Sequence, residues 1–288
     1  MKMVLLDGGL FNQVAQYVFA RNLAFQTQEP VLLDDSVFYL HESTATYQLG
    51  NFSNAMPTLL SQYFTSDVWE ALMVERNNGS CMPQVLKNNG LEFFMICEKE
   101  ETSFDGNTAF LPEHSFFPEL LKTKGNVYYN GSFSHGGWFA KYMDMFQEEL
   151  ALPPLQGADD IALSNKISNC FSVCIHLCRD TYLKKSVSLP NSYYKEAIKK
   201  IKAAYSDKNI HFFVFTADVD WCKNNKTVLG FDSIEKKLTY SHTNSAQLMA
   251  LCDVMVLSLN IDSYYAALLN SKSDKIVINP NPEKGVFL

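Results

Sequence analysis

Residues that could bind or activate an anionic group lie in short polar segments after predicted strands. The first segment follows an apolar run over 171–177 and contains His176, Arg179 and Asp180. An arginine at the end of a strand can neutralise a diphosphate and stabilise it as a leaving group. Arg179 could instead be a surface residue paired with Asp180, and a lone histidine here is more often a satisfied hydrogen-bonding group. The segment is therefore a candidate catalytic site with a plain structural alternative.

Two further loops in the same half follow predicted strands. Asp218 comes after the strand 211–215, and Ser263 comes after the strand 254–259. Ser263 could offer its hydroxyl and a helix-end N–H to an anion. Asp and Ser are also preferred N-cap residues, which is the more frequent role at such positions. Because ligands of doubly wound sheets bind at the carboxyl ends of the strands, both residues are candidates for donor binding.

A glycine turn near the start of the chain is another place where the backbone could approach a phosphate. Gly8 and Gly9 form the turn, and Asn12 and Gln13 follow in a segment whose apolar spacing predicts a helix. Glycines before a helix N-terminus leave room for a ligand next to unpaired N–H groups. The spacing fits neither the Rossmann fingerprint nor a P-loop. A turn capped by Asn12 is the structural alternative.

Acidic and sulfur-containing residues raise the question of a metal site. Asp34 and Asp35 follow a predicted strand and could hold a divalent cation, cap a helix or bind a hydroxyl. Cys170, Cys174 and Cys178 are spaced by four, but they fall on a predicted strand and the chain has no Cys-x-x-Cys pair. Buried structural thiols are the favoured interpretation. We therefore expect neither a metal nor a resident cofactor.

The elements that would position these residues form repeated α/β units. The chain opens with a strand near 3–6, the glycine turn, a helix and a second strand over 30–33. Residues 40–125 are harder to assign. The second half alternates strands and helices clearly, which predicts a parallel sheet with helices on both faces.

A break in the helical spacing divides the chain. One helix is predicted over 138–150, and Pro153 and Pro154 follow it. We predict an α/β protein with two Rossmann-like lobes, residues 1–152 and 153–288, each with a parallel sheet, and a cleft between them.

Composition limits the kinds of partner. The chain has 288 residues, a formal net charge of −7 and a pI of about 5.4. An acidic chain without an arginine-rich stretch is a poor ligand for nucleic acid, so we expect no such partner. No apolar run approaches the ~18 residues of a membrane span, and Met3 to Leu6 is too short for a secretory signal. We expect a cytoplasmic protein without an integral membrane segment, either free or peripheral at the inner face of the membrane.

Five blocks in a fixed order carry a more specific pattern. They are a glycine motif at 8–17, a His-to-Tyr segment at 176–182, an aromatic strand and turn at 212–218, a helix at 247–252 and a Ser-aromatic segment at 259–270. Together they resemble the bacterial α-1,2-fucosyltransferases, glycosyltransferase family 11. That family has Gly-Gly-Leu-Gly-Asn-Gln-x-x-Gln-Tyr, His-x-Arg-Arg-Gly-Asp-Tyr, Phe-Phe-x-Phe-Ser-Asp-Asp, Gln-Leu-Met-Ser-Leu-Cys and Asn-Ser-x-Phe-Ser-Trp-Trp-Gly-Ala-Trp-Leu-Asn at these places. The resemblance spans nearly the whole chain.

The resemblance implies a GT-B-like, metal-independent, inverting transferase. It would move L-fucose from GDP-fucose to a galactose 2-hydroxyl of a glycan acceptor, as in surface polysaccharide biosynthesis. The nucleotide-sugar would bind in the C-terminal lobe, and the acceptor would bind on the side of the N-terminal lobe, whose glycine turn would lie near the donor phosphates. The residues implied for the site are Arg179 and Asp180 for catalysis and Gly9, Asn12, Gln13, His176, Asp218 and Ser263 for donor binding.

The chain departs from the family pattern at phosphate-binding positions. Cys178 replaces the first arginine of the signature, which would hold the β-phosphate. Phe11 replaces a glycine, and its side chain could crowd the approach to the phosphate. Two alternatives therefore stay open: a weakened or inactive homologue that only binds nucleotide or glycan, and a transferase that uses a different nucleotide-sugar. The general base is open among Asp34, Asp35, His135 and Asp180.

Overall fold

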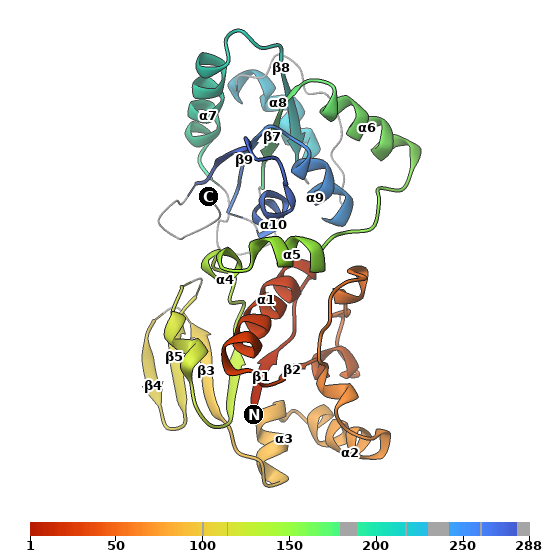
Figure 1. Ribbon diagram of the computed structural model, residues 1–288, viewed down its shortest axis with the longest axis vertical. Coiled ribbons are helices and arrows are strands. Elements are labelled where there is room, and N and C mark those ends of the chain that lie inside the picture. Colours follow the sequence, from red (N-terminus) through yellow and green to blue (C-terminus); the bar gives the residue numbers. More distant parts are fainter. Residues whose placement is uncertain are drawn as a thin grey trace. The chain divides into compact units, whose positions relative to one another are not determined.

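The computed structural model describes residues 1–99, 101–113, 115–178, 189–216, 218–229, 242–259 and 261–280. The chain divides into two compact units, Met1–Ala151 and Leu152–Leu288, which are called the first and second unit below. Figure 1 shows helices and strands in both. The division falls one residue before the boundary expected from the sequence.

The first unit is built around a mainly parallel sheet. Its elements in chain order are β1 (Lys2–Leu5), α1 (Leu10–Thr27), β2 (Val31–Asp34), the 3-10 turns Ser36–Tyr39, Leu49–Asn51 and Leu60–Gln62, α2 (Ser66–Asn77), α3 (Met82–Asn88), β3 (Phe94–Lys99), β4 (Ser103–Asp105), β5 (Thr108–Pro112), the 3-10 turn Pro118–Lys122, β6 (Val127–Asn130), α4 (Gly137–Ala140) and α5 (Met143–Glu149). Within the described residues the strand order is β2-β1-β6-β3-β5-β4, and only the β4–β5 pairing is antiparallel.

Helix α1 covers this sheet and carries the residues of the opening motif. It packs on β1 and β2 (Figure 1). Its Phe19 ring stacks on Phe133 at a centroid distance of 4.0 Å and meets Trp138 edge-on at 4.9 Å. All three rings are buried. Because aromatic pairs add to the free energy gained by burial, this cluster fixes α1 against the loop after β6.

Two sequence-based expectations for the first unit differ from the structure. The segment 40–125, which was hard to assign, contains β3 and β5, and β3 lies inside the sheet between β6 and β5. The predicted helix over 138–150 is wrong, because the structure divides it into α4 and α5. Tyr142 leaves the helical conformation at φ −127° and ψ 35°, and its ring packs on Phe25 of α1 at 4.7 Å. Aromatic packing against α1 therefore accompanies the break in the helix.

The second unit contains an all-parallel sheet within the residues described. Its elements are α6 (Ala158–Ser168), β7 (Phe171–His176), α7 (Asn191–Ala204), β8 (Ile210–Phe215), α8 (Val219–Leu229), α9 (His242–Ala250), β9 (Val254–Val256), α10 (Ile261–Leu269) and β10 (Ile276–Ile278), and the strand order is β10-β9-β7-β8. Helix α7 buries Tyr194, Ile198 and Ile201 against the strands and exposes its lysines. The expected α/β architecture with mainly parallel sheets is confirmed.

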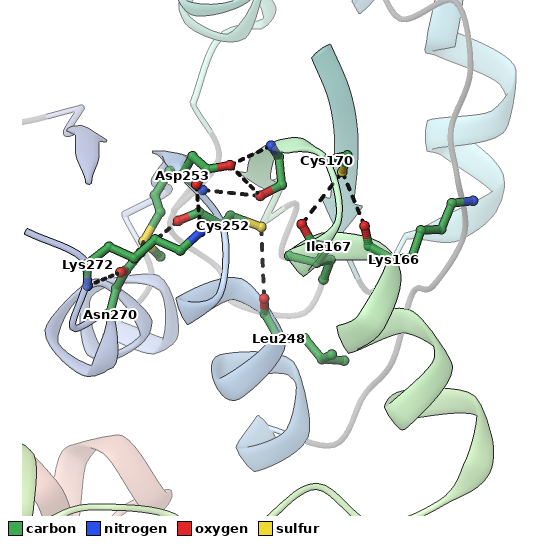
Figure 2. A network of polar contacts seen from close by, with 10 residues as sticks. Lys166, Ile167, Cys170, Leu248, Cys252, Asp253, Asn270 and Lys272 are labelled. Carbon is green, nitrogen blue, oxygen red and sulfur yellow. Dashed lines mark hydrogen bonds and ion pairs between the residues drawn. The ribbon is translucent and has the colours of Figure 1, made fainter. Parts of the chain in front are cut away.

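A set of polar contacts joins the amino-terminal ends of β7 and β9, and we call it the amino-edge network (Figure 2). The Ser172 N–H and hydroxyl both donate to Asp253 Oδ2, at 2.8 and 3.0 Å. Lys272 Nζ donates to Asp253 Oδ1 at 2.6 Å. The Asn270 amide donates to the Cys252 carbonyl at 2.8 Å. Burial alone would raise the pKa of Asp253, but the hydrogen bonds from Lys272 and Ser172 bring it below its usual value.

Buried Asp34 in the first unit makes the stability of this unit depend on pH. The carboxylate is fully buried and accepts hydrogen bonds from the Tyr128 hydroxyl at 2.6 Å and the Ser36 N–H at 3.0 Å. Burial outweighs these bonds and raises the pKa of Asp34 above its usual value. Between the two pKa values the folded state holds more protons than the unfolded state, so stability falls as pH rises.

We therefore expect the free energy of unfolding of the unaltered protein to fall, relative to that of Asp34→Asn, as pH rises from about 4 toward the raised pKa. Urea titrations of both proteins at several pH values measure this difference. A difference that stays constant, or that grows in favour of the unaltered protein, would contradict the assignment.

In the described part of the chain, no helix is both long and apolar enough to cross a membrane. In the same residues, no three His, Cys, Asp or Glu side chains gather as metal ligands would. Of the three cysteines singled out from their spacing, Cys174 is buried on β7, whereas Cys170 and Cys178 flank the strand and are only partly buried.

Candidate functional site

Strands β7, β8 and β9 end together at one edge of the second unit's sheet. In their parallel register Ile175 lies opposite Val256, and His176 lies opposite Phe215. The ladder continues one step further, because the Leu177 N–H donates to the Phe215 carbonyl at 2.9 Å. The loops that carry the predicted site residues of this unit therefore leave the sheet at the same edge, where α/β proteins bind ligands.

Three polar side chains connect at this edge. His176 Nδ1 lies 2.9 Å from Ser258 Oγ, and Ser258 Oγ lies 3.5 Å from Ser263 Oγ. The Ser258 N–H donates to Ser263 Oγ at 3.2 Å. Both serines are fully buried, whereas His176 is partly exposed. A hydrogen bond at one ring nitrogen fixes the orientation and tautomer of an imidazole, so Ser258 holds the ring that faces the edge.

The observed contacts of Ser263 differ from the anion contact considered for it from the sequence. It lies in the first turn of α10, but its hydroxyl has no exposed surface and donates to the Ser258 carbonyl at 3.3 Å. In this structure its contacts support the loop between β9 and α10. Ser258 itself was missed, because the predicted strand ran to Leu259 and placed Ser258 within it. The observed β9 ends at Val256, so Ser258 lies in the loop.

Asp218 acts as a helix cap. Its carboxylate accepts a hydrogen bond from the Trp221 N–H at 3.2 Å, in the first turn of α8. The Asp218 N–H donates in turn to the Thr216 hydroxyl at 3.1 Å. The capping alternative considered for this position is therefore what the structure shows, and it fixes the start of α8 beside the end of β8.

The signature segment itself is described only at its start. Cys178 is partly buried just after Leu177. Arg179, Asp180, Thr181 and Ala217 lie outside the described residues. The catalytic assignment of Arg179 and Asp180 therefore stays a prediction.

The glycine turn of the first unit combines a strained backbone position with an open one. Gly8 has φ +71°, where a side chain is strained, and a Cβ there would lie 2.6 Å from the Asn12 amide. At Gly9 a Cβ would meet nothing within 4 Å. Gly9 is the N-cap of α1, and no side chain caps the helix. Asn12 is thus not the cap that the structural alternative required, and the open side of Gly9 is compatible with the predicted approach of a ligand.

Gln13 joins this turn to a loop more than 30 residues away. Its amide nitrogen donates to the Gly8 carbonyl at 2.9 Å and to the Thr46 carbonyl at 2.8 Å. Its amide oxygen accepts from the Gln48 N–H at 2.8 Å. Both amide protons are therefore used, and the side chain is fully buried. Gln13, predicted as a donor-binding residue, makes its observed contacts with the backbone and fixes the loop 46–48.

The described candidates for a general base differ in burial and in their hydrogen-bond partners. Asp34 is fully buried and bound by Tyr128 and Ser36, so it has no surface for an acceptor hydroxyl. His135 Nδ1 accepts a hydrogen bond from the Gly137 N–H at 3.0 Å. Burial raises the pKa of the Asp35 carboxyl as well as that of Asp34. Asp34 is therefore removed from this set of candidates.

Comparison with known proteins identifies the family. The family model described as "Glycosyl transferase family 11" matches residues 115–287, which is more than half of the chain. The chain belongs to glycosyltransferase family 11. The prediction of a glycosyltransferase from this family is confirmed.

Two Escherichia coli relatives and a solved structure extend the likeness. The chain is 24% identical over 304 residues to "O-antigen biosynthesis glycosyltransferase WbnK", covering 96% of this chain and 92% of that protein. It is 26% identical over 167 residues to "Alpha-1,2-colitosyltransferase", covering 55% and 57%. Fucosyltransferase NodZ from Bradyrhizobium matches 93% of this chain and 92% of its own, with a TM-score of 0.53 and 13% identity. The last likeness shows that the fold is GT-B-like, as expected.

The link between His176 and Ser258 gives a testable result. We expect Ser258→Ala to lower kcat/KM for the nucleotide-sugar about tenfold, because the imidazole loses its fixed orientation. Ser258→Thr keeps a hydroxyl and should restore most of the activity. Ser164→Ala removes an exposed hydroxyl that donates to the Ile161 carbonyl, and it serves as the matched control. Equal activity of Ser258→Ala and Ser164→Ala would show that the contact does not position His176.

Proposed function

We propose that this glycosyltransferase moves L-fucose from GDP-fucose to the galactose 2-hydroxyl of a glycan, with inversion at the anomeric carbon. The observation that carries the proposal is the His176–Ser258–Ser263 connection at the carboxyl edge of the second unit's sheet. His176 and Ser263 belong to two separate blocks of the family pattern, and both are found at one ligand-binding edge. NodZ has been co-crystallised with GDP and soaked with GDP-fucose, which supports a guanine nucleotide donor.

The roles we propose follow from the contacts of each residue. His176 lies near the nucleotide, and Arg179 stabilises the leaving diphosphate with Asp180 beside it. Ser263 and Asp218 act by fixing the loops after β9 and β8. In the first unit the open side of Gly9 leaves its backbone accessible to a ligand, and Gln13 holds that turn in place.

The proposed reaction is a single displacement. The acceptor oxygen forms a bond to the anomeric carbon of the sugar while the bond from that carbon to the diphosphate oxygen breaks. The electron pair of the broken bond leaves with GDP, and the acceptor proton passes to a base or to water. Because the charge that develops is on the diphosphate, an arginine and backbone N–H groups aimed at it supply the stabilisation. The proposal includes no metal ion.

A different donor sugar is the second candidate. The relative named "Alpha-1,2-colitosyltransferase" carries a sugar other than fucose in its name and is 26% identical over 55% of this chain. Cys178 and Phe11 also depart from the fucosyltransferase pattern at phosphate-binding positions. A homologue that only binds nucleotide or glycan is the remaining alternative.

Calorimetry and product analysis separate these candidates. Titration with GDP, GDP-fucose and GDP-mannose measures whether the nucleotide binds and which sugar adds affinity. Incubation of GDP-fucose with a panel of galactosides, followed by NMR of the product, gives the linkage and the anomeric configuration. We expect GDP to bind and an α-1,2-linked product to form. Binding of GDP without any transfer would favour the homologue that only binds nucleotide or glycan. If saturating GDP gives no heat of binding, the proposal of a GDP-sugar donor is wrong.

A further inference from the structure

The first unit contains a cavity that none of the residues predicted for donor binding lines. It has a volume of about 330 Å³ and lies beyond the carboxyl end of β2. It is lined by Asp35, Phe38, Tyr39, Ala45, Thr46, Tyr47 and Leu59. Small-molecule pockets span about 300–1,000 Å³, so the cavity has room for a small ring rather than for a nucleotide-sugar.

Aromatic side chains form its walls. Phe38 and Tyr47 meet edge to face at a centroid distance of 6.0 Å. The Tyr39 ring meets the Trp69 ring edge to face at a centroid distance of 5.5 Å. Half of the Tyr39 surface and 37% of the Tyr47 surface are exposed. The electron-rich face of an aromatic ring attracts the weakly positive C–H groups on one face of a sugar ring, so exposed rings at a cavity suit a carbohydrate.

A buried carboxylate completes the cavity. Asp35 is 1% exposed, and Ser61 holds it through its N–H at 2.9 Å and its hydroxyl at 2.5 Å. The Tyr39 hydroxyl donates to the same Ser61 oxygen at 3.4 Å. A carboxylate has about four acceptor sites, so Asp35 can still accept a hydrogen bond from a ligand hydroxyl. The carboxylate is therefore fixed in place before a ligand arrives.

The charge of the lining selects among ligands. None of the seven lining residues is Lys or Arg, and Asp35 is the charged one. Burial, together with the charge of Asp35, raises the pKa of the Tyr47 phenol, so this hydroxyl stays a neutral donor. A phosphate or carboxylate ligand would meet an unfavourable charge at Asp35. We infer that this cavity binds one neutral hexopyranose ring of the acceptor glycan, stacked on Tyr47 and hydrogen-bonded to Asp35.

The opening motif of the chain holds one wall of the cavity. Gln13 binds the Thr46 carbonyl and the Gln48 N–H, on either side of Tyr47. Gln13 is thus a positioning residue for the stacking ring. That the bound sugar belongs to the acceptor rests on the proposed function. The presence of a sugar site depends on the cavity alone.

The test measures sugar binding without turnover. Saturation-transfer NMR is recorded with methyl β-D-galactopyranoside and with galactose 6-phosphate, in the presence and absence of GDP. We expect the neutral glycoside to bind and the phosphate to bind more weakly. Tyr47→Ala is expected to weaken binding of the glycoside about tenfold, since one stacked ring is lost. Asp35→Asn should also weaken it.

Tyr63→Ala is the matched control, because Tyr63 is an exposed tyrosine of the same unit that does not line the cavity. Glycoside binding that is absent in the unaltered protein, or equal in Tyr47→Ala and Tyr63→Ala, would overturn the inference. Stronger binding of the 6-phosphate would also overturn it. Calorimetry with GDP on the same samples tests the donor site separately. Loss of Tyr47 should leave the affinity for GDP unchanged.

Discussion

Replacing Cys178 with arginine is expected to raise the rate of sugar transfer about 100-fold. Cys178 occupies the position of the first arginine in the family signature. It directly follows Leu177, whose N–H makes the last backbone hydrogen bond between the described part of this segment and β8. In the proposed reaction, an arginine there would make a charge-assisted contact with the diphosphate that strengthens as the leaving group gains charge. Removing one such group from an active site typically costs 10² to 10³ in kcat. Steady-state kinetics with GDP-fucose and a galactoside measure the gain.

Cys170→Arg is the matched control for this prediction. Cys170 precedes β7, at the opposite edge of the sheet, where its thiol donates to the Lys166 carbonyl at 3.3 Å. This substitution adds the same charge to the same unit away from the predicted diphosphate. If Cys178→Arg and Cys170→Arg change the rate equally, the gain does not come from the diphosphate contact. If neither changes it, a different donor sugar is favoured over a weakened fucosyltransferase.

Phe11→Gly, which restores the glycine of the family motif, is expected to destabilise the first unit by about 4 kcal/mol. The sequence suggested that the Phe11 ring could crowd a bound phosphate. In the structure only 3% of Phe11 is exposed, so its ring belongs to the core under α1. Deleting a buried phenylalanine side chain leaves a cavity, and a glycine also weakens the first turn of the helix.

Chemical denaturation followed by circular dichroism measures this loss, and Phe11→Leu is its control. Leucine keeps most of the apolar volume, so its expected cost is below about 1.5 kcal/mol. A Phe11→Gly protein that is as stable as the unaltered one and binds GDP more tightly would show that the ring obstructs the phosphate after all.

Much of the second unit could be predicted, because its strands are short apolar runs separated by amphipathic helices. The strands β7 and β8 were placed within a residue or two. The first unit was harder beyond β2. Strand β3 ends in Glu98 and Lys99. Neither its composition nor an alternation of apolar and polar residues indicates a strand that lies inside a sheet. Its partners β5 and β6 are distant in the sequence from β1, so only tertiary pairing reveals the order.

The site was predicted by residue type but not by role. His176 and Ser263 were found because polar residues after strands are candidates for ligand binding, and the structure connects them through Ser258. Gln13 and Asp218 were assigned to the donor, yet their observed bonds go to the backbone. A sequence cannot separate these roles, because an amide that binds a loop and an amide that binds a ligand have the same chemistry. For Gln13, the hydrogen bond to the Thr46 carbonyl, far along the chain, shows that its amide binds a loop.

The amino-edge network bears on how such a chain can diverge. Ser172, Asp253, Asn270 and Lys272 join the strands at the edge from which no predicted site loop departs. Bonds that join β7 to β9 thus lie away from the loops that carry the predicted site residues of this unit. Substitutions in the loops at the other edge, Cys178 among them, leave these bonds intact. Under the proposed function, we therefore expect that the loops nearest the donor can change over many generations while these two strands stay joined.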